Sequence, residues 1–426
     1  MNETTTPGPF AGLRVIEFGR FIAAPYCGQL LADGGADVVK VEPLEGDASR
    51  RNGTQLTSTE ARQYLNKNRG KRSLAVKLRD PEVLGAIKKL VRRADVLITN
   101  FRPGLAARLG LDYETVATTN PRIVYAENTG FGHRGPLAGV AGMDLALQGY
   151  AGLAPLTADG PLPIADPVVD YGAALLMAFG ISTALFHRER TGKGQRLDVS
   201  LLQSALMLQN NTLSSIEGVD DWRTDFVDQL QTAFQNGKTW SDVRDERARR
   251  DGSAAVRSYY GFFETADGMI AIAAGGPGLR AKMAELLGVE DPSLMGPSFV
   301  ADDPDELIGP VYGEVTEKLR ARTTESWIEE FHAAGIPVGP VHIKEEVLDD
   351  SQAWANEYFV RVEHETVGTV QLVEPPVKFS GTPLASTASP TLGKHSLEVL
   401  EESGLSKEEV AALIARGVVV AQEPAR

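Results

Sequence analysis

An aspartate at the start of a long apolar segment is the residue of this sequence best placed to do chemistry. Asp170 lies in "PVVDYGAALLMAFGISTALFHRERTGKGQ", residues 167–195, just before an apolar run that predicts a helix. As the helix N-cap, its carboxylate would accept hydrogen bonds from the first-turn amides. The helix dipole would hold the same carboxylate ionised, and an ionised, oriented carboxylate can attack a thioester carbonyl. The local pattern leaves both roles open, helix cap and nucleophile.

Basic residues gather beside two predicted strands. Lys71 and Arg72 lie in "NKNRGKRS", and Arg108 lies in "NFRPGLAARLG", which begins at Asn100. The chain as a whole is acidic, with 57 acidic and 43 basic side chains and a formal net charge of −14. In such a protein, clustered basic residues near strand ends favour a local pocket for a polyanionic ligand, with Arg108 placed to bind a phosphate. Surface charges that only solvate loops would have the same spacing, so this alternative stays open.

Other catalytic patterns match poorly. The first predicted strand is followed by a single glycine in "EFGRFIAAP", where a dinucleotide site needs G-x-G-x-x-G. The six histidines lack metal-ligand spacing, cysteines are not paired, and no G-x-S-x-G motif occurs. The single cysteine, Cys27, stands at an apolar helix start, which predicts a packed side chain rather than a nucleophile. We therefore predict no metal site and no bound dinucleotide.

The composition also limits the partners and the location that we expect. An excess of acidic side chains argues against nucleic acid or an anionic membrane as the general partner. One cysteine fits a reducing cytoplasm, and the N-terminal "MNETTTPGPF" lacks the basic and apolar regions of a signal peptide. The apolar stretch 171–186 is interrupted by small and polar residues and falls short of a membrane span, which favours a buried helix. We expect a cytoplasmic protein without a membrane segment.

Short β-branched runs alternate with helical segments over the N-terminal half of the chain. The predicted helices include residues 25–33 and one that is opened by Asp80 and Pro81, a sound start signal. This alternation implies an α/β domain with a parallel sheet and helices on both faces, and ligands gather at the carboxyl ends of such strands. The predicted strands are residues 13–18, 36–42, 73–78, 94–100 and 121–128.

Beyond this region the character of the sequence changes. Residues 241–253 form a dense charge run with no apolar face, which is typical of a solvated connector. Residues 258–276 then predict a hairpin with its turn at Ala266-Asp267-Gly268. The predicted division is residues 1–204 for the large domain, 205–254 for a linker, 255–340 for a smaller α+β domain and 341–426 for a C-terminal segment.

A series of motifs, in order and over nearly the whole chain, resembles the family III CoA-transferases, the group of formyl-CoA and carnitine CoA-transferases. Each motif is weak alone, whereas eight in the same order are highly specific. They are "LRVIEFGRFIAAPYCGQLLADGGADVVKVEPLEGD", "NRGKRSLAVKL", "ADVLITNFRPGLAARLGLDYE", "NPRIVYAENTGFGHRGP", "RTGKGQRLDVSLLQSAL", "AGIPVGPV", "EPPVKFSGTP" and "PTLGKHSLEVL".

The resemblance implies a Rossmann-like large domain to which residues 341–426 return, a smaller domain and an interlocked homodimer. It implies the transfer of CoA from an acyl-CoA thioester to an acceptor carboxylic acid. Asp170 would be the nucleophile, through aspartyl anhydride and aspartyl-CoA thioester intermediates, and CoA would be a substrate with no permanently bound cofactor. The positions that match the family's CoA contacts are Ala23, Lys71, Arg72, Asn100, Phe101 and Arg108.

The 2-methylacyl-CoA racemases share this fold and many of these motifs, so they are the alternative. They need two bases on opposite faces of the α-carbon. In them, one base is a histidine of a G-H-D segment, and the other matches Asp170. This chain reads "AGMDLALQGYAGL", with Met143 at the histidine position, and a thioether cannot take a proton at neutral pH. The glycine loop of formyl-CoA transferases is also replaced, by "RRDGSAAVRSYY", so specificity for oxalate or formate is not predicted.

Overall fold

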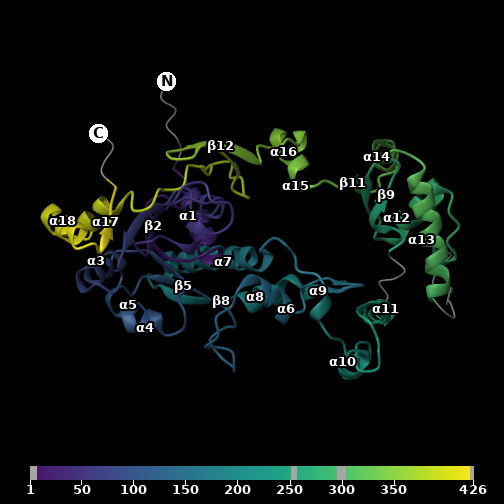
Figure 1. The fold of residues 1–426 in the computed structure, drawn as a ribbon, viewed down its shortest axis with the longest axis horizontal. Coiled ribbons are helices and arrows are strands. Elements are labelled where there is room, and N and C mark those ends of the chain that lie inside the picture. Colours follow the sequence, from purple (N-terminus) through teal and green to yellow (C-terminus); the bar gives the residue numbers. More distant parts are fainter. Residues whose placement is uncertain (1–6, 251–256, 295–303, 423–426) are drawn as a thin grey trace. The chain divides into compact units, whose positions relative to one another are not determined.

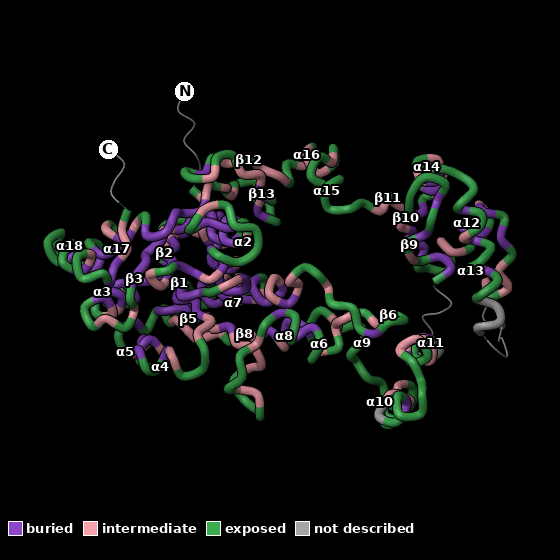
Figure 2. The backbone as a smooth tube through the Cα atoms, viewed as in Figure 1, coloured by how far each residue is buried: buried purple, intermediate pink, exposed green. Residues whose placement is uncertain are grey.

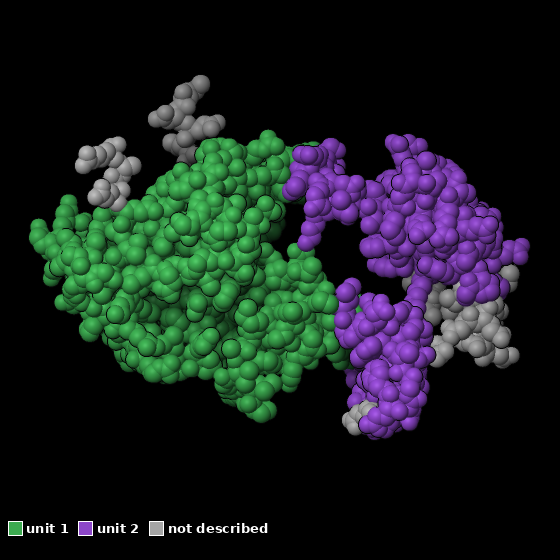
Figure 3. All heavy atoms as spheres, in the orientation of Figure 1, with its two compact units in different colours: residues 1–155, 163–214, 353–426 green, residues 156–162, 215–352 purple. Residues whose placement is uncertain are grey.

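The computed structural model describes residues 7–250, 257–294 and 304–422. It divides into two compact units, which Figure 3 distinguishes by colour. Unit 1 contains residues 1–155, 163–214 and 353–426, and unit 2 contains residues 156–162 and 215–352. Residues 1–6 of the segment that we compared with signal peptides, and residues 251–256 at the position of the family's glycine loop, lie outside the described residues.

Unit 1 is built on a seven-stranded sheet in the order β14-β3-β2-β1-β4-β5-β8 (Figure 1). All neighbouring strands are parallel except β14 and β3. The predicted parallel α/β domain is therefore confirmed, and its strand order reverses between β1 and β4, where such sheets bind ligands. The strands are β1 Arg14–Phe18, β2 Asp37–Glu42, β3 Arg72–Val76, β4 Val96–Thr99, β5 Val124–Thr129, β8 Gln195–Ser200 and β14 Val419–Val420.

Helices cover both faces of this sheet, because its strands present apolar side chains on both sides. One face packs against α1 Ala23–Asp33 and α7 Val168–Thr191, around Cys27, Met177 and Ile181. The other face packs against α3 Pro81–Val91, α17 Ser396–Glu402 and α18 Lys407–Ala415. Figure 2 shows the resulting concentration of buried residues in the sheet and in α7. Short helices complete unit 1: α2 Arg62–Leu65, α4 Leu105–Leu109, α5 Tyr113–Thr119, α6 Asp144–Tyr150, α8 Leu201–Leu208, α9 Asn210–Leu213 and α16 Ser351–Ala355, whose first two residues fall in unit 2.

Two helix boundaries depend on local chemistry, and the first of them was predicted. The Asp80 carboxylate accepts hydrogen bonds from the Glu82 and Val83 amides at 3.1 and 3.3 Å, so the predicted start of α3 is confirmed. α7 ends at Gly192, whose φ of 75° is a left-handed conformation that glycine adopts without strain. α7 is long and apolar enough to cross a membrane, and core helices of soluble proteins meet the same test. Here it packs against α1, β5, β8 and α8.

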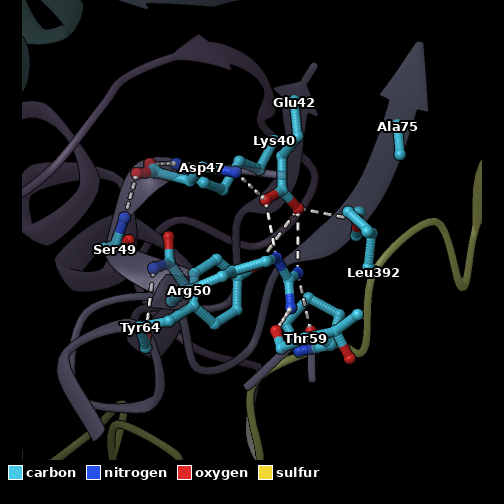
Figure 4. A network of polar contacts seen from close by, with 12 residues as sticks. Lys40, Glu42, Asp47, Ser49, Arg50, Thr59, Tyr64, Ala75 and Leu392 are labelled. Atoms are coloured by element: carbon cyan, nitrogen blue, oxygen red, sulfur yellow. Dashed lines mark hydrogen bonds and ion pairs between the residues drawn. The ribbon is translucent and has the colours of Figure 1, made fainter. Parts of the chain in front are cut away.

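A buried arginine joins distant parts of unit 1 (Figure 4). The Arg50 guanidinium donates two hydrogen bonds to Glu42, at 2.8 and 2.9 Å, and pairs with Glu60 at 2.8 Å. It also donates to the backbone oxygen of Pro390 at 3.1 Å, and lies 3.5 Å from the centre of the Tyr64 ring. Through these contacts the carboxyl end of β2 is connected to the C-terminal segment of the chain. That segment also contributes a hairpin to unit 1, β12 Phe359–His364 and β13 Gly368–Val373.

Unit 2 contains the predicted hairpin. β9 Tyr260–Glu264 and β10 Met269–Ala273 are antiparallel, and β11 Val338–Pro340 adds a third strand beside β10. The helices α12 Pro277–Leu287, α13 Pro304–Arg320 and α14 Thr324–Ala333 follow the hairpin. The region predicted as a linker, 205–254, contains helices up to residue 250, including α10 Trp222–Ala233 and α11 Trp240–Arg250. The part of the charge run in α11 is thus helical, with ion pairs such as Arg250 with Glu246 at 2.9 Å.

A second buried ionic cluster lies under the carboxyl end of β1. Glu17 of β1 pairs with Lys40 of β2 at 3.0 Å and with Lys71 at 2.7 Å, and all three side chains are fully buried. α1 crosses directly over this cluster. A Cβ atom on Gly28 of α1 would lie 2.1 Å from the nearer Glu17 carboxylate oxygen, so only glycine fits there.

We therefore expect Gly28→Ala to destabilise the protein by about 2–4 kcal/mol, because it overpacks the helix contact and disturbs a buried ion pair. The matched control is Gly85→Ala in the interior of α3, where a Cβ meets no atom within 4 Å. We expect this control to stabilise the protein by about 0.5–1 kcal/mol, the ordinary gain in a helix. Urea denaturation measures both, and a similar change in the two variants would contradict the close contact over Glu17.

Candidate functional site

Asp170 is the third residue of α7, inside its first turn, and the helix N-cap is Pro167. The prediction that Asp170 caps its own helix is therefore wrong. The backbone amides of Val169 and Asp170 donate instead to one oxygen of Asp144, at 2.8 and 2.9 Å. Asp144, from the start of α6, thus satisfies amide groups that a helix start leaves unpaired. This leaves the Asp170 carboxylate available for other contacts.

Asp144 is itself held in place. It is buried, and its second oxygen accepts a hydrogen bond from the Gln148 side chain at 2.5 Å. Gln148 in turn bonds both backbone groups of Ile164, in the segment that leads into α7. The start of α6 and the start of α7 are therefore connected through one carboxylate, and the position of Asp170 depends on it.

The Asp170 carboxyl accepts a backbone hydrogen bond from Ala23, the first residue of α1. Burial, and after it the nearby charge of Asp144, raise the pKa of Asp170 to about 7, against the lowering effects of Lys67 and of the Ala23 hydrogen bond. The expectation that the helix dipole simply keeps this group ionised is thus wrong, because burial outweighs it. A carboxyl with such a pKa can exist in both protonation states near neutral pH, as is common for catalytic groups.

A lysine that we did not single out from the sequence lies next to Asp170. Lys67, just after α2, is buried, and its ammonium lies 5.6 Å from the centre of the Tyr171 ring. Burial lowers the pKa of Lys67, and the negative charge of Asp170 opposes this. Tyr26 of α1 meets the Tyr171 ring edge-on, with 5.0 Å between the ring centres. The motif "NKNRGKRS" contains Lys67, but the spacing of the motif does not reveal that Lys67 lies near the Asp170 carboxyl.

Three of the predicted CoA contacts lie together where the strand order reverses. The Asn100 side chain exchanges two hydrogen bonds with the backbone of Arg20, at 3.0 and 2.9 Å, and so connects the ends of β4 and β1. The Phe101 ring packs 5.1 Å from Phe18 between ring centres. Ala23 begins α1 from the loop after β1. The structure therefore brings Ala23, Asn100 and Phe101 to the edge of the sheet at which parallel folds bind ligands.

Arg108, another predicted contact, is exposed in the short helix α4 that follows the same strand. Within the described part of the chain, its guanidinium forms no ion pair. An unpaired arginine beside the reversal of strand order is free to bind a phosphate group of a ligand.

Lys71 and Arg72 are placed differently. The Lys71 ammonium is buried, pairs with Glu17 and donates to the Pro25 backbone oxygen at 2.6 Å. Arg72 pairs with Asp37 at 2.7 Å, and with two glutamates of α17 on the face of the sheet opposite α1 and α7. Both cations already form ion pairs within the protein. Their contact with CoA stays a prediction, and these ion pairs do not support it.

One group of side chains in the described residues has the arrangement of metal ligands: Glu127, His133 and Asp198. The guanidinium of Arg196 lies among them, 2.8 Å from Asp198 and 3.1 Å from Glu127. A cation of the chain itself thus compensates the two carboxylates, which makes the cluster an ion-pair network.

The sequence pattern of the family described as CoA-transferase family III matches residues 10–396 of the chain. The chain belongs to this family. It is 33% identical to the succinate–glutarate CoA-transferase of Agrobacterium fabrum, over 92% of this chain and 95% of that protein. It is 32% identical to the succinyl-CoA–L-malate CoA-transferase beta subunit of Chloroflexus aurantiacus, over 98% of this chain and all of that protein. The crystal structure of a CaiB/BaiF family protein from Brucella suis matches with a TM-score of 0.71 and 29% identity, over 93% of this chain and 100% of that chain.

The predicted resemblance and the predicted enzyme class are thus confirmed: the protein is a family III CoA-transferase, and the substrates of this family are CoA thioesters. The structural match extends over the large parallel-sheet domain with its helices. The roles of the individual residues follow from the geometry above and are proposals.

The raised pKa of Asp170 predicts a pH-dependent cost in stability. The pKa is about 7 in the folded protein and near 3.8 for a solvated aspartate of the unfolded chain, so ionising Asp170 opposes folding. This cost is absent below about pH 4, grows as the pH rises, and is complete above about pH 7. Asp170→Asn removes the titration and keeps an oxygen for the Ala23 amide. We expect the variant to be more stable than the wild type by about 1–3 kcal/mol at pH 8, and by much less at pH 5.

Urea denaturation at the two pH values checks this expectation. The control variant is Asp166→Asn, which changes a neighbouring exposed carboxylate into the isosteric amide, as Asp170→Asn does. Gln148→Glu would not serve as a control, because it would add a charge. The proposed burial of charge at Asp170 would be contradicted by a variant whose stability follows the wild type at both pH values.

Proposed function

We propose that this transferase moves CoA from an acyl-CoA thioester to an acceptor carboxylic acid, with Asp170 as the nucleophile. The observation that carries the proposal is the environment of Asp170: a half-buried carboxyl with a pKa of about 7, oriented by the Ala23 backbone and free of its own helix. A group that can be ionised at neutral pH but is poorly solvated is a better nucleophile than a fully hydrated carboxylate.

The reaction balances as two exchanges at Asp170. A carboxylate oxygen attacks the thioester carbonyl carbon, the C–S bond breaks, and an aspartyl–acyl anhydride and CoA thiolate result. The thiolate attacks the aspartyl carbonyl of the anhydride, which releases the donor acid as its carboxylate and leaves an aspartyl-CoA thioester. The acceptor carboxylate attacks this thioester, which gives a second anhydride and CoA thiolate. The thiolate then attacks the acceptor carbonyl of this anhydride, which forms the new acyl-CoA and restores the Asp170 carboxylate. The thioester energy is kept because water is not a reactant in any step.

We propose that small dicarboxylic acids are the donor and acceptor class. Two similar transferases are named for succinate, glutarate and L-malate, which are all dicarboxylates. A second carboxylate needs a cation near Asp170. Arg20 and Arg134 are exposed, whereas Lys67 is buried beside Asp170, so the lysine is the better placed of the three.

For CoA we propose a path from Arg108 past Phe101 and Asn100 to Ala23. This path follows the edge of the sheet where β1 and β4 end, and it places the thioester next to Asp170, because Ala23 bonds that carboxyl. Arg108 would bind a phosphate at the other end. Lys71 and Arg72 support this site from within the protein instead of by direct contact.

We also propose the homodimer that the resemblance implies. α7 has an apolar face that is not covered in one chain: Leu175, Phe179 and Phe186 are exposed, Phe179 at 72% of its surface. Exposed aromatic and aliphatic side chains on one helix are typical of a surface that a partner covers. A second copy of the chain is the partner that the family resemblance favours.

Covalent capture tests the nucleophile. We expect an acyl-CoA donor, followed by hydroxylamine or borohydride trapping, to give a derivative on the peptide that contains Asp170, as measured by mass spectrometry. Asp170→Asn should give no adduct and lose CoA transfer by at least about 1,000-fold, because a carboxamide cannot form the anhydride. Asp166→Asn is the matched control and should keep both.

The same samples separate the racemase alternative. Met143 is exposed and lies next to Asp144, so a second base is missing at the position where racemases have histidine. If no adduct forms, while the α-proton of a branched acyl-CoA exchanges with deuterated solvent, the transferase mechanism proposed here is wrong and proton abstraction replaces it.

The Arg108 contact has its own test. We expect Arg108→Ala to raise the KM for acyl-CoA by about tenfold or more, because a charge-assisted hydrogen bond to phosphate is lost, with a change in kcat of less than about threefold. Arg14→Ala, at the exposed first residue of β1, is the control and should leave KM unchanged. Equal KM values in the two variants would remove Arg108 from the CoA site.

A further inference from the structure

We propose that Lys67 binds the second carboxylate of a dicarboxylic substrate beside Asp170, and so selects dicarboxylic over monocarboxylic acyl groups. The inference rests on the proposed function, because it needs an acyl group attached at Asp170. It adds a specificity-determining residue for which the sequence motif alone gives no reason.

The first observation is a buried cation without a partner. Lys67 is 5% exposed, yet within the described part of the chain its ammonium forms no hydrogen bond and no ion pair. It faces only the ring of Tyr171, at 5.6 Å. A buried ammonium is costly unless a counter-charge compensates it, so a lysine in this state is expected where a ligand brings that charge.

The other buried lysines of the described chain make the contrast clear. Lys40 pairs with Glu17 and Asp47, both at 3.0 Å, and Lys71 pairs with Glu17 at 2.7 Å. The fold thus supplies carboxylates to two of its three buried lysines, and not to Lys67. Stability alone does not explain the third, because an apolar side chain at the same place would avoid the cost of burying a charge.

The second observation is the position of Lys67 near Asp170. Its ammonium lies 5.6 Å from the ring centre of Tyr171, the residue that follows Asp170, and the negative charge of Asp170 acts on it. The two groups are not within ion-pair distance, so the carboxylate compensates the ammonium only in part. Lys67 therefore lies near the carboxyl to which the acyl group would be attached, and no ion pair within the described part of the protein neutralises its ammonium.

The chemistry of the cycle strengthens this argument. While Asp170 is an anhydride or a thioester, it carries no negative charge, and Lys67 loses the carboxylate that acts on it. A dicarboxylic acyl group brings a replacement in its free carboxylate, whereas a monocarboxylic group brings a methyl end. Lys67 therefore stabilises the covalent intermediate of a dicarboxylic acyl group more than that of a monocarboxylic one. This difference in free energy selects the dicarboxylic substrate.

The experiment compares the acylation of Asp170 by two donors of equal chain length, succinyl-CoA and butanoyl-CoA. Rapid quenching and mass spectrometry give the rate of adduct formation for each, and the measured quantity is the ratio of the two rates. In the wild type we expect succinyl-CoA to react faster by at least tenfold. In Lys67→Met, which keeps the length and the burial of the side chain, we expect this ratio to fall by about tenfold to hundredfold.

Two further variants complete the design. Lys67→Arg keeps the charge and should keep a preference for succinyl-CoA. Lys89→Met removes an exposed lysine on α3 and should leave the ratio as in the wild type, so it controls for the change in net charge. Thermal unfolding of each variant confirms that the compared proteins are folded.

The outcomes separate the two proposals. The inference is overturned if the ratio of the two rates in Lys67→Met equals that of the wild type. This holds if neither rate changes, and also if both rates fall together, because Lys67 would then affect only the reactivity of Asp170. A wild type without preference for succinyl-CoA overturns it as well. If the wild type forms no adduct with either donor, the nucleophilic role of Asp170 itself is wrong, and this is seen before any variant of Lys67 is compared.

Discussion

The geometry of the site depends on one buried carboxylate, Glu17, that two lysines share. Its oxygens lie 3.0 Å from Lys40 and 2.7 Å from Lys71, and all three side chains are inaccessible to water. Such a cluster costs free energy to bury, and removal of one partner would leave an uncompensated charge in the interior. The cluster fixes positions, because Lys40 also bonds the backbone between β1 and α1, and Lys71 bonds the backbone in the first turn of α1.

These backbone bonds connect the cluster to the surroundings of Asp170, the proposed nucleophile. The Lys40 ammonium donates to the Gly19 carbonyl at 2.8 Å, and Lys71 donates to the Pro25 carbonyl at 2.6 Å. Between them, Phe21 has a φ of 64°, a conformation that a bulky residue rarely adopts and that persists only where the surroundings hold it. The same held segment contains Ala23, whose backbone bonds Asp170. Lys71, which matches a CoA-contact position of the family, thus helps to fix the shape of the site.

Much of the fold was predictable, because its determinants are local. The apolar runs of the strands, the Asp80 cap of α3 and the glycine that ends α7 are signals within a few residues of the elements that they define. The site was less predictable for the opposite reason. The carboxylate that caps α7 is Asp144, 26 positions before Asp170, and no pattern near Asp170 indicates it. Lys67 lies in a quoted motif, yet only its folded surroundings distinguish it from the paired lysines.

The charges around Asp170 suit those that the proposed cycle requires. Burial and the charge of Asp144 raise the pKa of Asp170 to about 7 against the lowering effect of Lys67, so neither protonation state is strongly favoured at neutral pH. A carboxylate fixed in a strong ion pair would be a poor nucleophile, since the pair would have to break at each turnover. A carboxyl group buried to the same extent with no cation nearby would have a still higher pKa and would stay largely protonated. In the proposed cycle the negative charge of Asp170 is lost once, when the first anhydride forms, and regained once, when the new acyl-CoA leaves. A site with opposed and incompletely paired neighbours keeps the energies of the charged and covalent states close together. A substrate carboxylate at Lys67 would then complete the charge balance in the covalent states, where the protein alone does not.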